Sequence, residues 1–126
     1  MRLLMIDDDP TIGEFVRNVA EPLGYAVETH TEAAGFKAAV AQAAPDVIVL
    51  DLTIPGSDGF ELLRYLAKRR ERARIFIMSG FEPEHQRMAV TLGEAQGLAM
   101  AGIIPKPVRA ADLRAMLAPP AADSGA

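Results

Sequence analysis

The chain has 126 residues, enough for one domain with a single hydrophobic core but too few for two. It is 50% hydrophobic and 24% charged, as ordinary soluble globular proteins are, and without cysteine it has neither a disulfide framework nor a thiolate metal site. No apolar run approaches the roughly 20 residues of a membrane-spanning helix. The first acidic residue, Asp7, comes too early to leave room for the apolar stretch of a secretory signal. We therefore predict a cytoplasmic protein, and its net charge of −4 weakly disfavours nonspecific nucleic-acid binding.

Five apolar runs alternate with segments of helical length. The runs, which we interpret as strands, are Leu3–Ile6, Tyr25–Val27, Val47–Leu50, Ile75–Met78 and Met100–Ile104. Apolar residues recur at helical spacing at Ile12, Phe15, Val16 and Val19; at Ala33, Phe36, Val40 and Ala43; at Leu62, Leu63 and Leu66; and at Leu113, Met116 and Leu117. Helix starts are indicated by Asp9 before Pro10, Thr31 before Glu32, and Asp58 with Glu61; stops are indicated by Gly24 and Ala44-Pro45.

This (βα)5 alternation predicts an α/β domain with three layers and right-handed crossovers. Three of the runs are continuously apolar, which is typical of parallel strands covered on both faces. We place the domain at residues 1–118, and we interpret residues 119–126 as a flexible tail or the start of a linker. In such folds, ligands bind outside the carboxyl ends of the strands.

Polar residues follow four of the five runs at once. They are Asp7-Asp8-Asp9, Asp51, Ser79 and Pro105-Lys106-Pro107. The fold would bring all four to one edge of the sheet, where several carboxylates need a cation. Oxygen ligands without nearby histidine or cysteine suit Mg²⁺, and a lysine and a hydroxyl beside it would form a cradle for a phosphoryl group. Asp51 is then the candidate nucleophile that accepts phosphate.

With these residues in this order, the chain resembles the CheY-like receiver domains of two-component response regulators over about residues 1–118. The resemblance rests on the acidic triplet, the segment Asp51-Leu52-Thr53-Ile54-Pro55-Gly56-Ser57-Asp58-Gly59, Ser79 and Lys106-Pro107. It implies a flavodoxin-like, doubly wound parallel sheet with strand order 2-1-3-4-5. It also implies a signalling domain rather than an enzyme with external substrates. Such a domain takes phosphate from a histidine kinase or phosphotransfer protein and slowly removes it.

The resemblance also assigns roles to residues. Asp51 is expected to be the phosphoacceptor, and Lys106 and Ser79 are expected to contact phosphoryl oxygens. The expected ligands of Mg²⁺, or of Mn²⁺ in its place, are Asp7, Asp8, Asp51 and the backbone carbonyl of Thr53. Pro107 stands where a cis peptide follows the lysine in this family. Asp9 is expected to cap the first helix, and Asp58-Gly59 to form the turn and cap of the third.

Two departures from the family pattern concern the output. Ile103 stands where many receivers carry Tyr or Phe, so the usual aromatic switch is in doubt. Ser79 and Lys106 are also about five residues further apart than in most receivers, which predicts a longer fourth helix or an added turn at Gly97. The sequence of that segment is similar to receivers attached to EAL-type phosphodiesterase domains, which suggests an output domain beyond residue 126. Bulky Phe81 is predicted to restrict the water that hydrolyses the aspartyl phosphate.

Other readings of the same residues stay open. Taken alone, the acidic triplet fits a helix cap, and Ser79 and Lys106 fit a loop and a surface charge. The competing functions are a phosphohydrolase, which would need a second carboxylate at Thr53, a flavodoxin-like cofactor protein, and a pseudo-receiver that never takes phosphate. His30 and His85 are interpreted as surface histidines. A basic cluster of Arg64, Lys68, Arg69, Arg70, Arg72 and Arg74 is interpreted as a solvated helix end, with an acidic partner as the less favoured reading.

Overall fold

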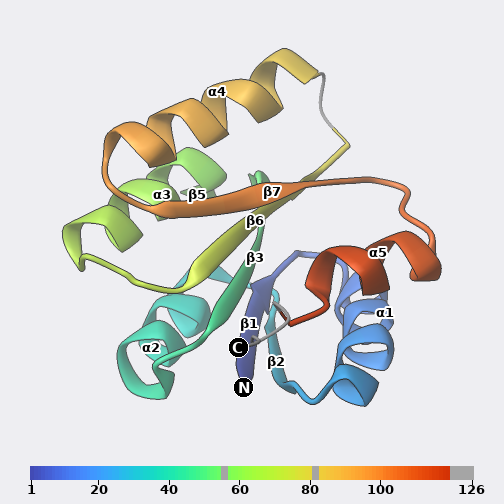
Figure 1. Cartoon of the computed structure of the whole chain (residues 1–126). Helices are drawn as coiled ribbons and strands as arrows, with labels where there is room; N and C mark the ends of the chain where they lie inside the picture. Colours follow the sequence, from blue (N-terminus) through green and yellow to red (C-terminus); the bar gives the residue numbers. More distant parts are fainter. Residues whose placement is uncertain (55–56, 81–82, 120–126) are drawn as a thin grey trace, which may run out of the picture.

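Five parallel strands form one sheet at the centre of the molecule (Figure 1). The computed structural model describes residues 1–54, 57–80 and 83–119. The strands are β1 (Arg2–Ile6), β2 (Ala26–His30), β3 (Val47–Asp51), β6 (Arg74–Ser79) and β7 (Ala99–Pro105). Their spatial order is β2-β1-β3-β6-β7, which confirms the predicted order 2-1-3-4-5 and the flavodoxin-like α/β fold.

Helices cover both faces of this sheet, as the crossover rule for parallel strands requires. They are α1 (Pro10–Ala20), the 3-10 turn η1 (Glu21–Leu23), α2 (Ala33–Ala43), α3 (Gly59–Lys68), α4 (Pro83–Ala95) and α5 (Ala110–Leu117). In Figure 1, α1 and α5 lie together on one side of the sheet, while α2, α3 and α4 lie on the other. The hydrophobic core is therefore divided into two layers.

Strand β1 shows how one short sequence supplies both layers. Leu3 and Met5 join the cluster under α1 and α5, whereas Leu4 and Ile6 join the cluster under α2, α3 and α4. All four are buried because successive side chains of a strand point to opposite faces and both faces are covered. This explains why the central strands are continuously apolar in sequence.

The structure departs from the predicted elements by one residue at the ends of several strands and more clearly at three places. Strand β2 starts at Ala26 rather than Tyr25 and continues to His30, because pairing with β1 carries it past the apolar run. Helix α2 starts at Ala33, with Glu32 rather than Thr31 at the N-cap position and no side-chain cap. The predicted turn after Asp51 includes a two-stranded antiparallel ribbon, β4 (Thr53–Ile54) with β5 (Ser57–Asp58).

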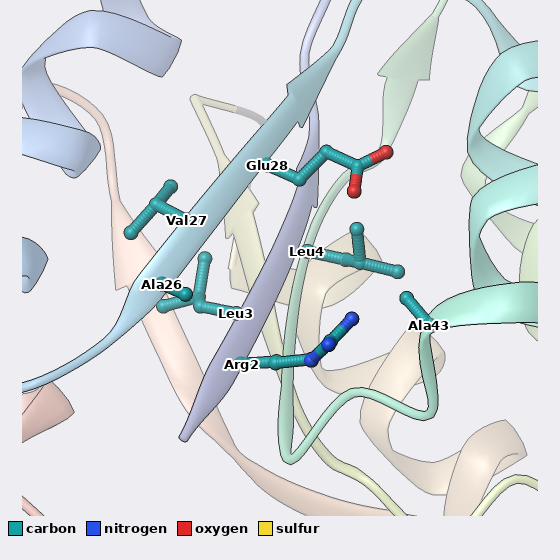
Figure 2. A pocket seen from close by; sticks show the side chains of 7 residues that line it. All are labelled: Arg2, Leu3, Leu4, Ala26, Val27, Glu28 and Ala43. Atoms are coloured by element: carbon teal, nitrogen blue, oxygen red, sulfur yellow. The ribbon is translucent and has the colours of Figure 1, made fainter.

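A pocket of about 170 Å³ lies between β1, β2 and the end of α2 (Figure 2). In Figure 2, Arg2, Leu4 and Glu28 extend toward Ala43 of α2, while Leu3 and Val27 point to the opposite side. None of the polar strand-end residues lines this pocket. The pocket is therefore separate from the functional site predicted at the carboxyl edge of the sheet. No helix of the described residues combines the length and the apolar character needed to cross a membrane.

Candidate functional site

Backbone pairing carries the predicted functional residues to the carboxyl edge of the sheet. The N–H of Asp7 donates to the carbonyl of His30 at 3.0 Å, one step beyond β1, and Asp51 is the last residue of β3. Ser79 ends β6, and its carbonyl accepts a hydrogen bond from the Lys106 N–H at 3.1 Å. Four positions that are far apart in the sequence are thus fixed relative to one another by main-chain hydrogen bonds.

The side chain of Lys106 joins two buried carboxylates. Its Nζ lies 2.6 Å from Oδ2 of Asp7 and 3.5 Å from Oδ2 of Asp51. Asp7 is 2% exposed and Asp51 is 1% exposed, whereas a quarter of the Lys106 side chain remains exposed. Charges removed from water in this way are tolerated only when they are paired, so the three side chains form one electrostatic unit.

The pKa of Lys106 reflects this balance. Partial burial disfavours the charged ammonium, but the hydrogen bond to Asp7 and the negative charges of Asp51 and Asp7 outweigh that effect. The pKa of Lys106 is therefore raised above its ordinary value. The side chain is a cation at neutral pH and lies beside both carboxylates.

Three carboxylates meet at this edge, which is the ligand set that the sequence predicts for a divalent cation. Asp7, Asp8 and Asp51 each offer an oxygen, and these oxygens lie within 4.8 Å of one another. Oδ1 of Asp7 accepts a hydrogen bond from the Asp9 N–H at 2.9 Å. Oδ2 of Asp7 is buried, and the Lys106 ammonium lies 2.6 Å from it as its charged partner. Two buried carboxylates beside exposed Asp8, with one oxygen of each within 4.8 Å of the others, fit a hydrated divalent cation.

Asp9 belongs to the helix rather than to the acidic cluster. Its Oδ1 accepts hydrogen bonds from the Thr11 N–H at 3.0 Å and from the Thr11 hydroxyl at 2.7 Å, which makes it the N-cap of α1. These two bonds to the charged form lower the pKa of Asp9. The predicted capping role of Asp9 is confirmed.

Gly59 holds the segment after Asp51 close to the sheet. Its N–H donates to the Leu52 carbonyl at 3.1 Å. A Cβ at this position would lie 2.6 Å from Cα of Leu52 and 3.1 Å from the carbonyl oxygen of Asp51. Only glycine permits this approach of backbone to backbone, so Gly59 has a larger role than the predicted turn and cap.

Comparisons with known proteins identify the family of the chain. A family model described as the response regulator receiver domain matches residues 3–118. The chain belongs to this family. Receiver domains are signalling modules of two-component response regulators, and phosphorylation and Mg²⁺ are typical of them.

Individual relatives show how far the similarity extends. The receiver is 32% identical over 88 residues to the transcriptional regulatory protein QseB of Escherichia coli O157:H7, covering 70% of this chain and 40% of QseB. It is 36% identical over 77 residues to the DNA-binding dual master transcriptional regulator RpaA of Synechocystis sp., covering 61% of this chain and 32% of RpaA. The chain thus spans 40% or less of these two relatives.

Solved structures share the fold over nearly the whole chain. A response regulator from Colwellia psychrerythraea superimposes with a TM-score of 0.81 and 28% identity, covering 92% of both chains. The chemotaxis response regulator CheY4 of Vibrio cholerae gives a TM-score of 0.79 at 24% identity, covering 92% of this chain and 94% of CheY4. The latter similarity concerns the fold alone.

The receiver departs from the family pattern on the side of β7. Ile103, at the position of the usual aromatic residue, is half-buried and pairs in register with Ile77. Helix α4 ends at Ala95 and is followed by a turn with Gly97 at a φ of +87°, which corresponds to the second of the two predicted alternatives. A register shift opposite Ile75 and Phe76 takes up one further residue of β7.

The remaining predicted residues are tested by the structure to different extents. The peptide bond between Lys106 and Pro107 is cis, as the family position implies. Thr53 pairs with Asp58 in the β4–β5 ribbon, and the metal-binding role of its carbonyl stays a prediction. Phe81 lies outside the described residues. His85 is exposed on α4, and His30 is partly exposed, with its Nε2 2.7 Å from Oε2 of Glu28.

Gln86 is a site neighbour that the sequence does not reveal. Its Nε2 donates to the Ser79 carbonyl at 3.1 Å, which links the first half of α4 to the end of β6. A glutamine on an exposed helix is unremarkable in sequence. Its contact depends on the angle at which α4 packs on the sheet, and this angle is a tertiary property.

Proposed function

We propose that this receiver accepts a phosphoryl group on Asp51 from the phosphohistidine of a partner kinase or phosphotransfer protein. The observation that carries the proposal is the ammonium of Lys106 shared between the buried carboxylates of Asp51 and Asp7, at the edge where Ser79 also ends its strand. Membership of the receiver family supports the same chemistry. The phosphorylated domain would then act as a switch for an output domain or partner.

The transfer step is a substitution at phosphorus. A carboxylate oxygen of Asp51 forms a bond to phosphorus while the bond from phosphorus to the imidazole nitrogen breaks, and that electron pair stays on the nitrogen. The product is an acyl phosphate on Asp51 and a free histidine on the donor. Slow loss of phosphate is the attack of water on the same phosphorus, which releases inorganic phosphate and restores the carboxylate.

Lys106 and Ser79 would act on the charge of the transferring group. The ammonium of Lys106 already lies 3.5 Å from Asp51, so it can pair with an oxygen of a phosphoryl group carried there. The Ser79 hydroxyl stands at the end of the neighbouring strand and is expected to hydrogen-bond another oxygen. Because the main chain fixes both residues beforehand, little reorganisation is needed when charge develops.

Asp7, Asp8 and Asp51 would hold the metal ion, with the Thr53 carbonyl as a further ligand. Mg²⁺ is the preferred ion for this all-oxygen donor set, and Mn²⁺ is an alternative. When bound, the ion neutralises negative charge on the phosphoryl oxygens.

The switch is proposed to pass through Ser79 and α4 rather than through an aromatic side chain. Ile103 has no ring that can turn inward, whereas Gln86 connects α4 directly to the Ser79 carbonyl. Movement of Ser79 toward a phosphoryl group would therefore be transmitted to α4 through this hydrogen bond. A phosphoryl group shifts a two-state equilibrium only if one state contacts it better, and Ser79 offers such a contact.

We place the switch at residues 1–118, and residues 119–126 would lead toward an output domain. The relatives described above are named as transcriptional regulators, so a DNA-binding output fits them better than the EAL-type domain suggested by the sequence. Nothing in the comparisons supports the EAL prediction.

Intact mass spectrometry after incubation with acetyl phosphate and Mg²⁺ tests the proposal. The wild-type chain should gain the mass of one phosphoryl group, and Asp51→Asn should gain none. Omission of Mg²⁺ or addition of a chelator should suppress the gain. Absence of the adduct on the wild-type chain would favour the pseudo-receiver, and equal modification of Asp51→Asn would place the acceptor elsewhere.

A further inference from the structure

The loop between α3 and β6 carries three exposed arginines in four positions. Arg69, Arg70 and Arg72 form what we call the arginine ridge. The ridge leads into the first residue of β6, so it lies at the amino edge of the sheet, opposite the carboxyl edge with Asp51 (Figure 1). It therefore needs an explanation that is independent of the phosphoacceptor site.

Arg70 adopts a backbone conformation that favours glycine. The Glu71 N–H donates to the Leu66 carbonyl at 3.0 Å and the Arg70 N–H donates to the Ala67 carbonyl at 3.0 Å, which together form a Schellman motif. Its left-handed position is Arg70, with a φ of +57°. Helix α4 ends in the same motif, but there the left-handed residue is Gly97. The chain therefore uses glycine in one of these two Schellman motifs and an arginine in the other, while α2 ends without such a motif at left-handed Ala44, with a φ of +47°.

The cations of this region have no acidic partner among the described residues. The only acid within the loop is Glu71, and its carboxylate accepts hydrogen bonds from the Arg72 and Ala73 N–H groups at 3.1 Å each. No ion pair between described side chains involves the ridge or the neighbouring Arg64 and Lys68. The helix dipole explains Lys68 in the last turn of α3 and Arg69 just beyond it, but glycine in place of Arg70 would leave that effect intact.

Two clefts flank the ridge. One, of about 450 Å³, has the ridge residues Arg70 and Arg72 on one side and the turn from Gln96 to Ala99 on the other. The second, of about 290 Å³, has Val40, Ala44 and Pro45 opposite the same ridge. Each cleft thus combines guanidinium groups with apolar side chains and is also lined by Glu71, whose carboxylate is engaged by the two backbone hydrogen bonds described above. A lining of this mixed kind fits a polypeptide better than a single small anion.

We propose that the arginine ridge and its two flanking clefts bind an acidic polypeptide segment. Carboxylates would pair with the planar guanidinium groups, and small apolar side chains would enter the clefts. A single nucleic-acid strand fits less well, because stacking of bases needs a free aromatic face. Two aromatic residues lie four positions from the ridge in sequence. The ring of Tyr65 already lies under Lys37 at 5.2 Å and Arg69 at 5.9 Å, and Phe76 is buried.

The test uses a fluorescein-labelled peptide of alternating glutamate and alanine and the whole chain labelled with ¹⁵N. Fluorescence anisotropy should show binding that weakens with salt, and amide shifts should concentrate at residues 40–45, 69–72 and 96–99. Arg70→Gly should weaken binding about tenfold, since it removes one charge-assisted contact. The same substitution relieves the left-handed strain, so its thermal midpoint should equal or exceed that of the wild type.

The control variant is Arg114→Gln, which removes an exposed arginine from α5, away from the ridge. Its affinity for the peptide should equal that of the wild type. An equal loss in both variants would show general charge attraction and would overturn the proposal. So would the absence of binding, an unchanged affinity in Arg70→Gly, or tighter binding of a single-stranded oligonucleotide of matched length.

Discussion

The two edges of the sheet differ in the burial and the pairing of their charged side chains. At the carboxyl edge, Asp7 and Asp51 are buried and share the Lys106 ammonium. At the amino edge, Arg69, Arg70 and Arg72 are exposed and have no ion-pair partner among the described side chains. Buried charges need a partner even when no ligand is bound, whereas exposed charges are stabilised by water without one. The carboxyl edge is therefore a preorganised chemical site, and the amino edge has the character of an interaction surface.

The largest expected effect on stability comes from the backbone contact that supports the carboxyl edge. Gly59→Ala would place a Cβ 2.6 Å from Cα of Leu52, and a backbone atom cannot yield as a side chain can. We expect a loss of about 2–4 kcal/mol in the free energy of unfolding, measured by urea denaturation. Gly80→Ala is the matched control at the same edge, because its Cβ would meet Lys106 at an ordinary 3.8 Å. Equal stability of the two variants would contradict this account of Gly59.

Removal of the shared cation should be the next largest change. Lys106→Met leaves Asp7 and Asp51 buried without their counter-charge, and because Lys106 is partly exposed we expect a loss of about 1–3 kcal/mol. Added Mg²⁺ should restore more stability to this variant than to the wild type. Lys68→Met, at the exposed end of α3, should change the unfolding free energy little. A loss of similar size in Lys68→Met would remove the distinction between the two edges.

At the amino edge the sign of the effect should reverse. Arg70→Gly relieves a left-handed residue with no paired charge, so we expect a gain of about 0.5–1 kcal/mol in the free energy of unfolding. Gly97→Arg makes the opposite exchange at the end of α4 and should cost about 1 kcal/mol. Thermal unfolding of both variants measures the pair. A loss of stability in Arg70→Gly would mean that the Arg70 side chain supports the fold.

The smallest effect concerns pH and the cap of α1. Hydrogen bonds from Thr11 lower the pKa of Asp9, so the folded state binds a proton less readily than the unfolded state. The stabilising contribution is therefore present above the unfolded pKa of about 3.9 and is lost as pH falls through the lower folded value. Asp9→Asn should show a shallower loss of stability over that acidic range, measured by urea denaturation at several pH values. Identical acid profiles would contradict a charged cap.

Several features of the fold could be predicted because they have local causes. The continuous apolar runs of β1, β3 and β6 indicate strands covered on both faces, and Asp9 before Pro10 indicates a capped helix. The end of β2 was missed because an edge strand is held by its pairing with β1 rather than by its own apolar pattern. The ribbon β4–β5 was missed because the same segment fits a simple turn.

By itself, the sequence determined the order of the elements and the four polar groups that follow the strands. Each of these depends on residue type and spacing, which act over one element at a time. Only the tertiary structure decided that Lys106 bridges Asp7 and Asp51, that Gln86 reaches the Ser79 carbonyl, and that Gly59 lies against Leu52. These contacts join segments through the packing of helices on a twisted sheet. Their distances are set by that packing and cannot be predicted from any single segment of the chain.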